Sequence, residues 1–413
     1  MIKVHYHSDC PFFAGCENML TNFFNSEKFR KNHDVSFSYR YSVKYSQGLT
    51  LRLTNQLPVY PLVFLNFSEF SFFDNRLLNK LAILILRLLL TLPEFFYQIF
   101  ILFRLFRKIK PDILHINNGG YPGALSARAA VVAAKLSGVP KVLMVVNNLA
   151  LNYKRFSRIL DFPLDILVGK LADLFITGSQ VASLKLISVL NLSSMKVKAV
   201  HNGISLRKVS CGKEITRQRL GLENFNGVVF GVVSLLIERK GHKVLLNAIK
   251  NIVEEGRVPD DGFKVLIEGE GPLLKELSDF VNKNELNGCI RFVGMEANIV
   301  DFISILDVFL LPSIRDEDFP NVIIEAMALA KPVIASRLAG TPEQVANGVT
   351  GILVDPNKSR ELDDAICYLV AHPAKRLEMG KSGLIRFKAK FTCQRALDNY
   401  SDIYTRLLEI KND

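Results

Sequence analysis

Residues 313–336 read SIRDEDFPNVIIEAMALAKPVIAS, a charged loop followed by an apolar helix pattern and an apolar strand pattern. Pro320 suits the first turn of the helix, because its missing N–H would have no helical partner there. Pro332 limits the other end, since the residue before a proline avoids the helical conformation. A helix that is apolar on nearly every side is expected to be buried. This one nevertheless carries a carboxylate, Glu325, at its centre.

A buried carboxylate without a partner is costly, so Glu325 needs one. One interpretation is a structural ion pair or a bond to a neighbouring backbone N–H. The other is a hydroxyl group of a ligand. Glu317, in the loop just before the helix, would point into the same crevice. The positive end of the helix dipole lies between the two residues and favours an anionic ligand.

Short apolar runs alternate with turns and helical patterns along both halves of the chain. They cover residues 2–6, 34–39, 112–116, 141–146 and 174–177, and then 227–233, 263–269, 290–294, 308–313, 331–336 and 351–354. Apolar strands that alternate with helices indicate parallel sheets covered on both faces. The sequence therefore predicts two doubly wound α/β domains, with ligands at the carboxyl ends of the strands.

The length of 413 residues also suggests two domains. A polar stretch at 201–227 contains two Asn-Gly steps and is the expected linker. We expect an N-terminal domain over 1–205, a C-terminal domain over 206–392 and a closing helix over 393–413. An apolar content of 49% is enough for two cores.

The formal net charge of +12 is compatible with nucleic acid, an anionic membrane or a phosphate-bearing substrate. The chain has no zinc-finger spacing, no helix-turn-helix signal and no long Lys/Arg block, so no nucleic-acid partner is expected. Six scattered cysteines without a Cys-x-x-Cys pair suit a reducing compartment. We expect a cytoplasmic location.

Residues 77–106 read LLNKLAILILRLLLTLPEFFYQIFILFRLF and are unusually apolar. Arg87 and the Pro93–Glu94 pair break the segment into two helical pieces of about a dozen residues, too short to span a membrane. The favoured interpretation is a helical hairpin lying in a membrane surface. Buried core helices and a true membrane span are the alternatives. Basic residues near its end would suit anionic headgroups: Arg104, Arg107, Lys108 and Lys110.

Three glycine turns and a dibasic pair are candidate phosphate sites. Arg239 and Lys240 follow the strand pattern at 227–233, and two adjacent cations at a strand's carboxyl end suit a diphosphate. A solvated basic turn is the alternative. Gly241 adjoins this pair, Gly271 lies in a second strand-to-helix turn, and Gly15 in a third.

Histidines also lie near strand ends, at His5, His115 and His201. Their spacing matches no metal motif, so we expect core histidines with satisfied hydrogen bonds and no metal site.

The stretch EDFPNVIIEAMALAKPVIASRLAGTPEQVANGVTGILVDP at 317–356 resembles the signature of family 4 retaining glycosyltransferases. Further pieces fit in order: DCPFFAGCENML, DILHINNGGYPG, VHNGI, ERKGH, IEGEGP, IRFVGM and LDVFLLPS. The resemblance implies the GT-B fold, in which two doubly wound Rossmann-like domains face each other across a cleft. It also implies that the final helix packs back on the N-terminal domain.

The resemblance implies roles for matching residues. Glu317 would contact the donor sugar, and Glu325 would bind the ribose hydroxyls of the nucleotide. Lys240, with Arg239 beside it, would hold the diphosphate and stabilise charge as it leaves. Other donor-binding positions are Gly15, Phe319, Pro320, Asn321, Val322, Gly271, Met295 and Asn147.

The implied reaction is sugar transfer with retention of configuration, without a metal or another cofactor. The donor would be a nucleotide sugar, with a UDP-sugar favoured and a GDP-sugar possible. The acceptor would be a glycan or lipid-linked saccharide, used in cell-envelope polysaccharide or lipopolysaccharide synthesis. We expect the protein to be peripheral on the inner face of the cytoplasmic membrane.

Two positions depart from the family pattern. Leu235 stands where an arginine is usual, five residues before Lys240, and Asn147 stands where many members have a histidine. They leave open a donor-binding but inactive regulatory subunit. A sugar-nucleotide epimerase is a less favoured alternative, because the glutamate motif is more typical of transferases.

Overall fold

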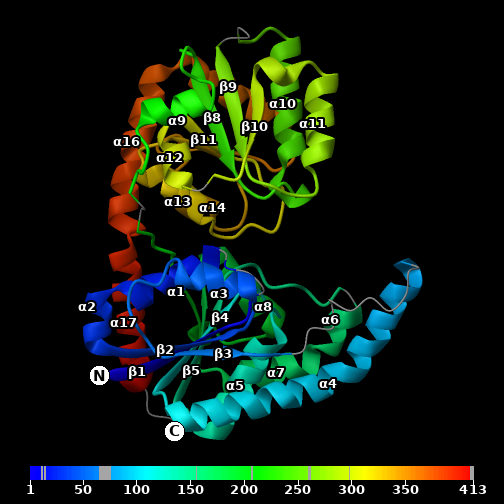
Figure 1. The fold of residues 1–413 in the computed structure, drawn as a ribbon, viewed down its shortest axis with the longest axis vertical. Coiled ribbons are helices and arrows are strands. Elements are labelled where there is room, and N and C mark those ends of the chain that lie inside the picture. The colour runs from blue at the N-terminus through cyan, green and yellow to red at the C-terminus, as the bar shows by residue number, and fades with distance from the viewer. Residues whose placement is uncertain are drawn as a thin grey trace. The chain divides into compact units, whose positions relative to one another are not determined.

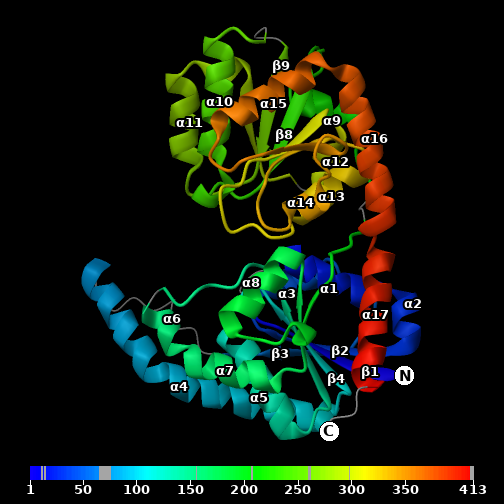
Figure 2. The same ribbon diagram turned by 180° about the vertical axis from the view of Figure 1, so that it is seen from behind.

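The computed structural model describes residues 1–10, 13, 15–64, 76–154, 156–205, 208–258, 262–296 and 298–409. The chain forms two compact units (Figures 1 and 2). The N-terminal unit comprises Met1–Val200 and the chain from Leu397 onward, and the C-terminal unit comprises His201–Ala396. Each unit is described separately below.

The N-terminal unit is built on a seven-stranded parallel sheet in the order β3-β2-β1-β4-β5-β6-β7. Its strands are β1 (Ile2–Ser8), β2 (His33–Arg40), β3 (Val59–Leu62), β4 (Ile113–Asn118), β5 (Lys141–Val146), β6 (Leu174–Thr177) and β7 (Val197–Ala199). The strand order reverses between β1 and β4, which are direct neighbours. Open α/β sheets bind ligands outside the carboxyl ends of the strands at such a reversal.

Helices cover both faces of this sheet (Figure 1). They are α1 (Gly15–Asn25), α2 (Glu27–Asn32), α3 (Val43–Thr50), α4 (Arg76–Ile109), α5 (Leu125–Ser137), α6 (Phe156–Leu160), α7 (Phe162–Leu171), α8 (Gln180–Leu190) and the last helix, α17 (Cys393–Glu409). Residues of α4, α5 and α7 share one apolar core with β4 and β5.

The last helix completes the opposite side of this sheet. The Tyr404 hydroxyl lies 2.6 Å from His115 Nδ1 on β4 and 3.0 Å from the Tyr6 hydroxyl on β1. Tyr404 and Tyr6 are fully buried. Phe23 of α1 packs edge-on against Tyr400 of α17. An aromatic cluster therefore ties the end of the chain to the first strand.

The structure contradicts the predicted break at Pro93. One continuous helix, α4, runs through this proline, so the segment is not a hairpin of two short helices. A proline removes only one helical hydrogen bond, at a cost of about 3 kcal/mol. Burial of Phe95, Leu102 and Phe106 against the core outweighs that cost.

The exposed side of α4 is apolar. Leu89, Leu92, Phe96 and Phe100 are each more than half exposed. By length and composition alone, Leu89–Ile109 is apolar enough to cross a membrane, and only 28% of its most apolar window is buried. Side chains of 76–88 lie outside the described residues.

The C-terminal unit has a six-stranded parallel sheet in the order β10-β9-β8-β11-β12-β13. Its strands are β8 (Val228–Val233), β9 (Phe263–Glu268), β10 (Ile290–Gly294), β11 (Val308–Leu311), β12 (Val333–Ser336) and β13 (Gly351–Val354). This is the doubly wound order, reversing between β8 and β11. The predicted α/β architecture is thus confirmed for both units.

Helices cover both faces of the second sheet as well (Figure 2). They are α9 (Lys213–Arg219), α10 (His242–Glu254), α11 (Leu274–Lys283), α12 (Ile299–Ser304), α13 (Asn321–Ala328), α14 (Thr341–Gln344), α15 (Ser359–Ala371) and α16 (Pro373–Lys390). An apolar core joins α10, α11 and α15 to the strands. Polar loops follow the carboxyl ends of β8 and β11, outside this core.

Candidate donor site and the family it belongs to

The reversal of strand order in the C-terminal unit brings two loops together. The loop after β8, residues 234–241, carries Arg239 and Lys240. The loop after β11, residues 312–320, carries Glu317. The backbone N–H of Ile314 donates to the Arg239 carbonyl at 2.8 Å, which ties the loops to each other.

Three donors converge on one oxygen of Glu317, Oε2. Lys240 Nζ lies 2.5 Å from it, the Ser313 hydroxyl 2.9 Å and Arg239 Nη1 3.4 Å. The Glu317 and Lys240 side chains are each 11% exposed. Arg239 and Lys240 place two cations side by side here, which suits an anionic ligand. The expected neighbours Glu317, Lys240 and Arg239 are therefore placed together.

Glycine lets the backbones of this region pack closely. Gly241 has φ +72°, and a Cβ there would lie 1.9 Å from the Pro312 carbonyl oxygen. At Gly271 a Cβ would lie 2.5 Å from the carbonyl oxygen of Leu236. Gly271 thus holds the turn after β9 against the loop that carries Lys240, which is a packing role beside any contact with a donor.

Helix α13 corrects the expectation of a fully buried Glu325. Glu325 is half-buried, as are Asn321 and Val322 on the preceding turn, whereas Ile323 and Ile324 are fully buried. The composition is apolar all round, but one face of the helix is left accessible because the sheet covers only the other. The Glu325 side chain is therefore on a face that a ligand can reach.

Three residues outside the predicted donor set support the start of α13. Asn202 Nδ2 donates to Asn321 Oδ1 at 3.0 Å, and Gln344 Nε2 donates to the Pro320 carbonyl at 3.0 Å. His201 stacks on Phe319 with ring centroids 4.8 Å apart. The Phe319 and Pro320 side chains are buried, so these two residues can offer a ligand little beyond their backbone.

Two other positions lie at the rim of the same sheet edge. Met295, just after β10, is 64% exposed, and Leu235 is 49% exposed. Between their strands Glu268 is buried, and that burial raises the pKa of its carboxyl group. Glu268 Oε1 accepts the Glu296 backbone N–H at 3.0 Å, which fixes the chain beside Met295.

The N-terminal unit holds the remaining predicted residues. Gly15 is exposed and begins α1, while residues 11, 12 and 14 of its turn lie outside the described residues. Asn147 Nδ2 donates to Asn117 Oδ1 at 2.7 Å and to the Asn118 carbonyl at 3.0 Å. Asn147 is thereby fixed at the carboxyl end of β5 with its side chain half-buried.

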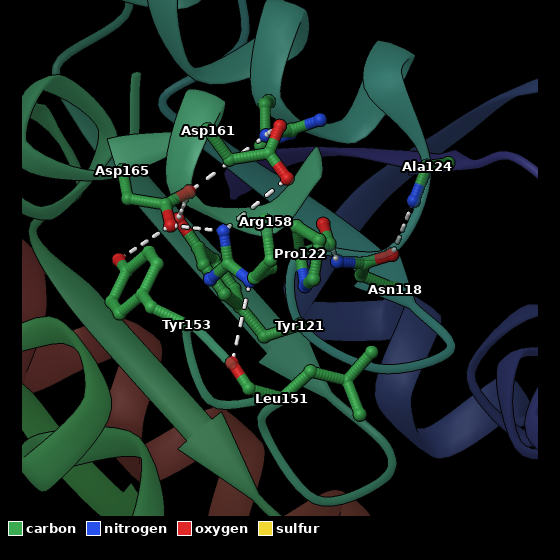
Figure 3. A network of polar contacts seen from close by, with 10 residues as sticks. Asn118, Tyr121, Pro122, Ala124, Leu151, Tyr153, Arg158, Asp161 and Asp165 are labelled. Atoms are coloured by element: carbon green, nitrogen blue, oxygen red, sulfur yellow. Dashed lines mark hydrogen bonds and ion pairs between the residues drawn. The ribbon is translucent and has the colours of Figure 1, made fainter. Parts of the chain in front are cut away.

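The loops after β4 and β5 are anchored by a buried charged network that sequence did not reveal (Figure 3). Arg158 Nη1 lies 2.5 Å from Asp165 Oδ2, and Arg158 Nε donates to the Leu151 carbonyl at 3.3 Å. Tyr121 and Tyr153 each donate a hydroxyl hydrogen bond to Asp165, at 3.1 and 2.7 Å.

A second arginine joins this network through Asp161. Arg128 Nη1 lies 2.7 Å from Asp161 Oδ1 and 3.7 Å from Asp165 Oδ1. Two arginines therefore balance two aspartates, and Arg128, Arg158 and Asp165 are buried. The arrangement is a charge-neutral anchor for the loops on which Tyr121 and Tyr153 lie.

The histidine expectation is confirmed for two of three residues. His5 is fully buried between the Ser36 and Ser38 hydroxyls at 2.8 Å each, and burial lowers its pKa to about 3. His115 is buried against Tyr404, and burial lowers its pKa to about 3. His201 is instead partly exposed, with Nε2 2.9 Å from Glu343 Oε2.

Comparison with known families identifies the C-terminal unit. Residues 213–385 match the family "Glycosyl transferases group 1". The C-terminal unit is a group 1 glycosyl transferase domain. The matched range contains Arg239, Lys240, Gly271, Glu317 and Glu325, and excludes the N-terminal residues assigned to the donor.

Individual proteins of related sequence are also glycosyltransferases by name. An uncharacterised glycosyltransferase of Methanocaldococcus jannaschii is 32% identical over 181 residues, 43% of this chain and 48% of that one. The chain thus spans about half the length of that relative. The UDP-Gal:alpha-D-GlcNAc-diphosphoundecaprenol alpha-1,3-galactosyltransferase of Escherichia coli is 28% identical over 309 residues, 73% of this chain and 77% of that one.

A solved structure of similar fold covers both units. Anabaena HepE, crystallised in complex with UDP, has a TM-score of 0.77 and 19% sequence identity, over 98% of this chain and 100% of that one. At that identity the likeness establishes the fold, which is GT-B. Assignment to family 4 in particular remains a prediction.

Proposed function

We propose that the chain is a retaining glycosyltransferase that moves a sugar from a nucleotide sugar to a glycan or lipid-linked acceptor. The observation that carries the proposal is the convergence of Lys240, Arg239 and Ser313 on Glu317 at the strand reversal of the C-terminal unit. Two cations there suit a diphosphate, and a carboxylate beside them suits sugar hydroxyls.

In this proposal Lys240 and Arg239 bind the diphosphate and stabilise the negative charge that develops as the sugar–phosphate bond breaks. They supply the positive charge that the leaving group needs, so the proposed reaction uses no metal ion. Arg239 approaches Glu317 from the end of the turn opposite Leu235, and so takes the place of the missing arginine.

Glu317 and Glu325 bind different parts of the donor. Glu317, held by Lys240, accepts hydroxyl hydrogen bonds from the sugar through the oxygen that the loop leaves available. Glu325 lies about one turn along the neighbouring helix, on the accessible face that it shares with Asn321 and Val322. There it accepts the ribose hydroxyls, which fixes the nucleotide relative to the diphosphate.

The acceptor proposal draws on relatives and on α4. The name of the E. coli relative specifies a lipid-linked acceptor. Another similar protein is named as a capsular polysaccharide biosynthesis glycosyltransferase of Staphylococcus aureus. An acceptor of that kind is presented at a membrane. The exposed side chains of Leu92, Phe96 and Phe100 suit partial insertion in a bilayer surface, and exposed basic residues follow them. We therefore place the protein on the cytoplasmic face of a membrane.

The test is a thermal-shift panel of UDP, GDP and their sugars. A ligand at about 100 times its dissociation constant stabilises the folded protein by roughly 2.7 kcal/mol, so the true donor is visible. A UDP-sugar is expected to give the largest shift, followed by slow release of UDP without acceptor. No shift with any nucleotide sugar would overturn the proposal.

A second candidate is a donor-binding subunit without activity, favoured by the exposed Leu235 at the position where the family usually has arginine. It predicts the same thermal shift but no release of UDP, with or without membrane extracts as acceptor. Measured UDP release above the uncatalysed rate excludes it.

A further inference from the structure

A stacked histidine supports the loop that carries Glu317 in the C-terminal unit. The His201 ring lies nearly parallel to the Phe319 ring, with ring centroids 4.8 Å apart and an interplanar angle of 12°. Phe319 is buried and follows Glu317 by two residues, and Glu317 accepts a hydrogen bond from Lys240. His201 therefore contacts the loop of the proposed diphosphate site without belonging to it.

A second contact fixes the orientation of the His201 ring. Its Nε2 lies 2.9 Å from Glu343 Oε2 on α14. Arg386 of α16 donates from Nη2 to the Glu343 carbonyl and from Nε to the Gln344 carbonyl, both at 2.7 Å. Gln344 Nε2 donates to the Pro320 carbonyl at 3.0 Å. The contacts that begin at His201 therefore lead back to the start of α13.

Phe391 supplies the third ring of this cluster. Its ring packs edge-on against Phe319 with centroids 5.8 Å apart, and its centroid lies 5.8 Å from that of the His201 ring. The Phe391 carbonyl also accepts the Ile204 backbone N–H at 3.0 Å. Because buried side chains are closely packed, the two rings restrict Phe319 to one orientation and thereby fix the backbone beside it.

Pro320 offers no side-chain cap to α13, so the direction of the helix start depends on the preceding loop. Pro320 occupies the N-cap position, and proline has no side-chain oxygen that could accept from the first N–H groups of a helix. Backbone N–H groups at a helix start bind phosphate oxygens when they point at the ligand. A displaced Phe319 would move Pro320 and turn these groups away from the diphosphate.

We propose that His201 is a positioning residue of the donor site. Its stack on Phe319 and its contact with Glu343 hold the start of α13 in the orientation that binds the diphosphate of the donor. The inference rests on the proposed transferase function and adds a residue outside the predicted donor set. His201 precedes residues 213–385, the range that matches the family, and begins the C-terminal unit.

The test compares a nucleoside diphosphate with its nucleoside, using UDP with uridine and GDP with guanosine. Binding to the full chain is measured by ligand-observed NMR. His201→Ala should weaken binding of the diphosphate about tenfold, as for one lost hydrogen bond to a charged group, and leave the nucleoside affinity unchanged. A general loss of structure in the site would weaken both ligands alike. His372→Ala is the matched control, because His372 stacks on Tyr368 in the same unit.

Two further variants separate the contacts of His201. His201→Phe keeps the stacked ring and loses the contact with Glu343, whereas His201→Gln keeps a donor for Glu343 and loses the ring. His201→Phe should bind the diphosphate more tightly than His201→Gln, because the stack on Phe319 is the direct contact with the loop. Thermal unfolding without ligand identifies the variants that are folded, and this pair decides the question if His201→Ala is not.

The inference is overturned if folded His201→Ala binds the diphosphate as tightly as wild type, or if it loses affinity for diphosphate and nucleoside equally. A His201→Phe variant that binds the diphosphate no more tightly than His201→Gln also overturns it. Wild type that binds neither UDP nor GDP would refute the proposed function on which the inference rests. That result differs from the others because it is seen before any residue is changed.

Discussion

Lys240 and Glu317 lie 77 positions apart in the chain, yet Lys240 Nζ and Glu317 Oε2 are 2.5 Å apart. Neither loop by itself brings these two side chains together. The strand order brings them together, because β8 and β11 are hydrogen-bonded neighbours and each loop begins at the carboxyl end of one of these strands. A charged pair at this position is available to a ligand in a way that a pair inside the core is not.

We expect Lys240→Ala to lower kcat by about 10² to 10³-fold, since a positive charge opposite the leaving diphosphate is lost. The thermal shift with UDP-sugar should fall as well. Lys243→Ala is the matched control, because Lys243 is half exposed and pairs with Glu276 at the surface. Equal losses in both variants would contradict the assigned role of Lys240.

Glu325→Ala should remove the preference for ribose. Wild type is expected to bind UDP roughly 10 to 100 times more tightly than 2′-deoxy- or 3′-deoxy-UDP, as for hydrogen bonds to a charged group. The variant should bind all three alike. Calorimetry measures these affinities, and a preference that survives in Glu325→Ala would show that Glu325 does not contact the ribose.

Replacing Leu92, Phe96 and Phe100 together by serine should abolish sedimentation with anionic vesicles. Each large apolar side chain contributes up to about 1.5–3 kcal/mol when buried. Leu377→Ser with Ile385→Ser removes two equally exposed apolar side chains from α16 and serves as the control. A triple variant that still sediments with vesicles would exclude α4 as the membrane surface.

Arg158→Met should destabilise the protein by about 3–5 kcal/mol, because the buried Asp165 carboxylate then loses its ion pair with Arg158. Denaturant unfolding monitored by circular dichroism measures the change. Arg360→Met removes an exposed arginine bonded to Glu255 and should have little effect. A small effect of Arg158→Met would mean that water or Arg128 replaces the lost charge.

Acidification should weaken the N-terminal unit. Burial holds the pKa of His115 at about 3, whereas an unfolded histidine has a pKa near 6.5. Between these values only the unfolded state takes up a proton, so stability is greatest above pH 6.5 and falls as the pH falls. His115→Gln should therefore lose roughly 2 kcal/mol less than wild type between pH 7 and pH 5. Substitution of the exposed His372 is the control.

The strand pattern was predictable because buried parallel strands are nearly continuous apolar runs. The two strands that the sequence did not indicate have physical reasons. β3 contains Pro61 and lies at the sheet edge, where proline is tolerated, and β7 has only three residues. The predicted break of α4 at Pro93 was wrong because the free-energy cost of the proline is smaller than the stabilisation from the side chains buried around it.

The donor residues were predictable by motif, whereas their partners were not. Ser313 contacts Glu317 only because of loop geometry, and His201 reaches Glu343 from a distant part of the chain. The half-exposure of Glu325 could not be predicted either, because composition does not say which face of a helix the sheet covers.

The dependence of Tyr6 and His115 on Tyr404 has a consequence for synthesis on the ribosome. All of His201–Ala396 emerges before the part of α17 from Leu397 onward, which completes the first unit. Although domains tend to fold from the N-terminus onward, here the second unit has its full sequence first, and residues 1–200 must wait until α17 has been synthesised. A fragment ending at residue 200 should consequently be insoluble or loosely folded, whereas 201–396 expressed alone has every strand of its sheet.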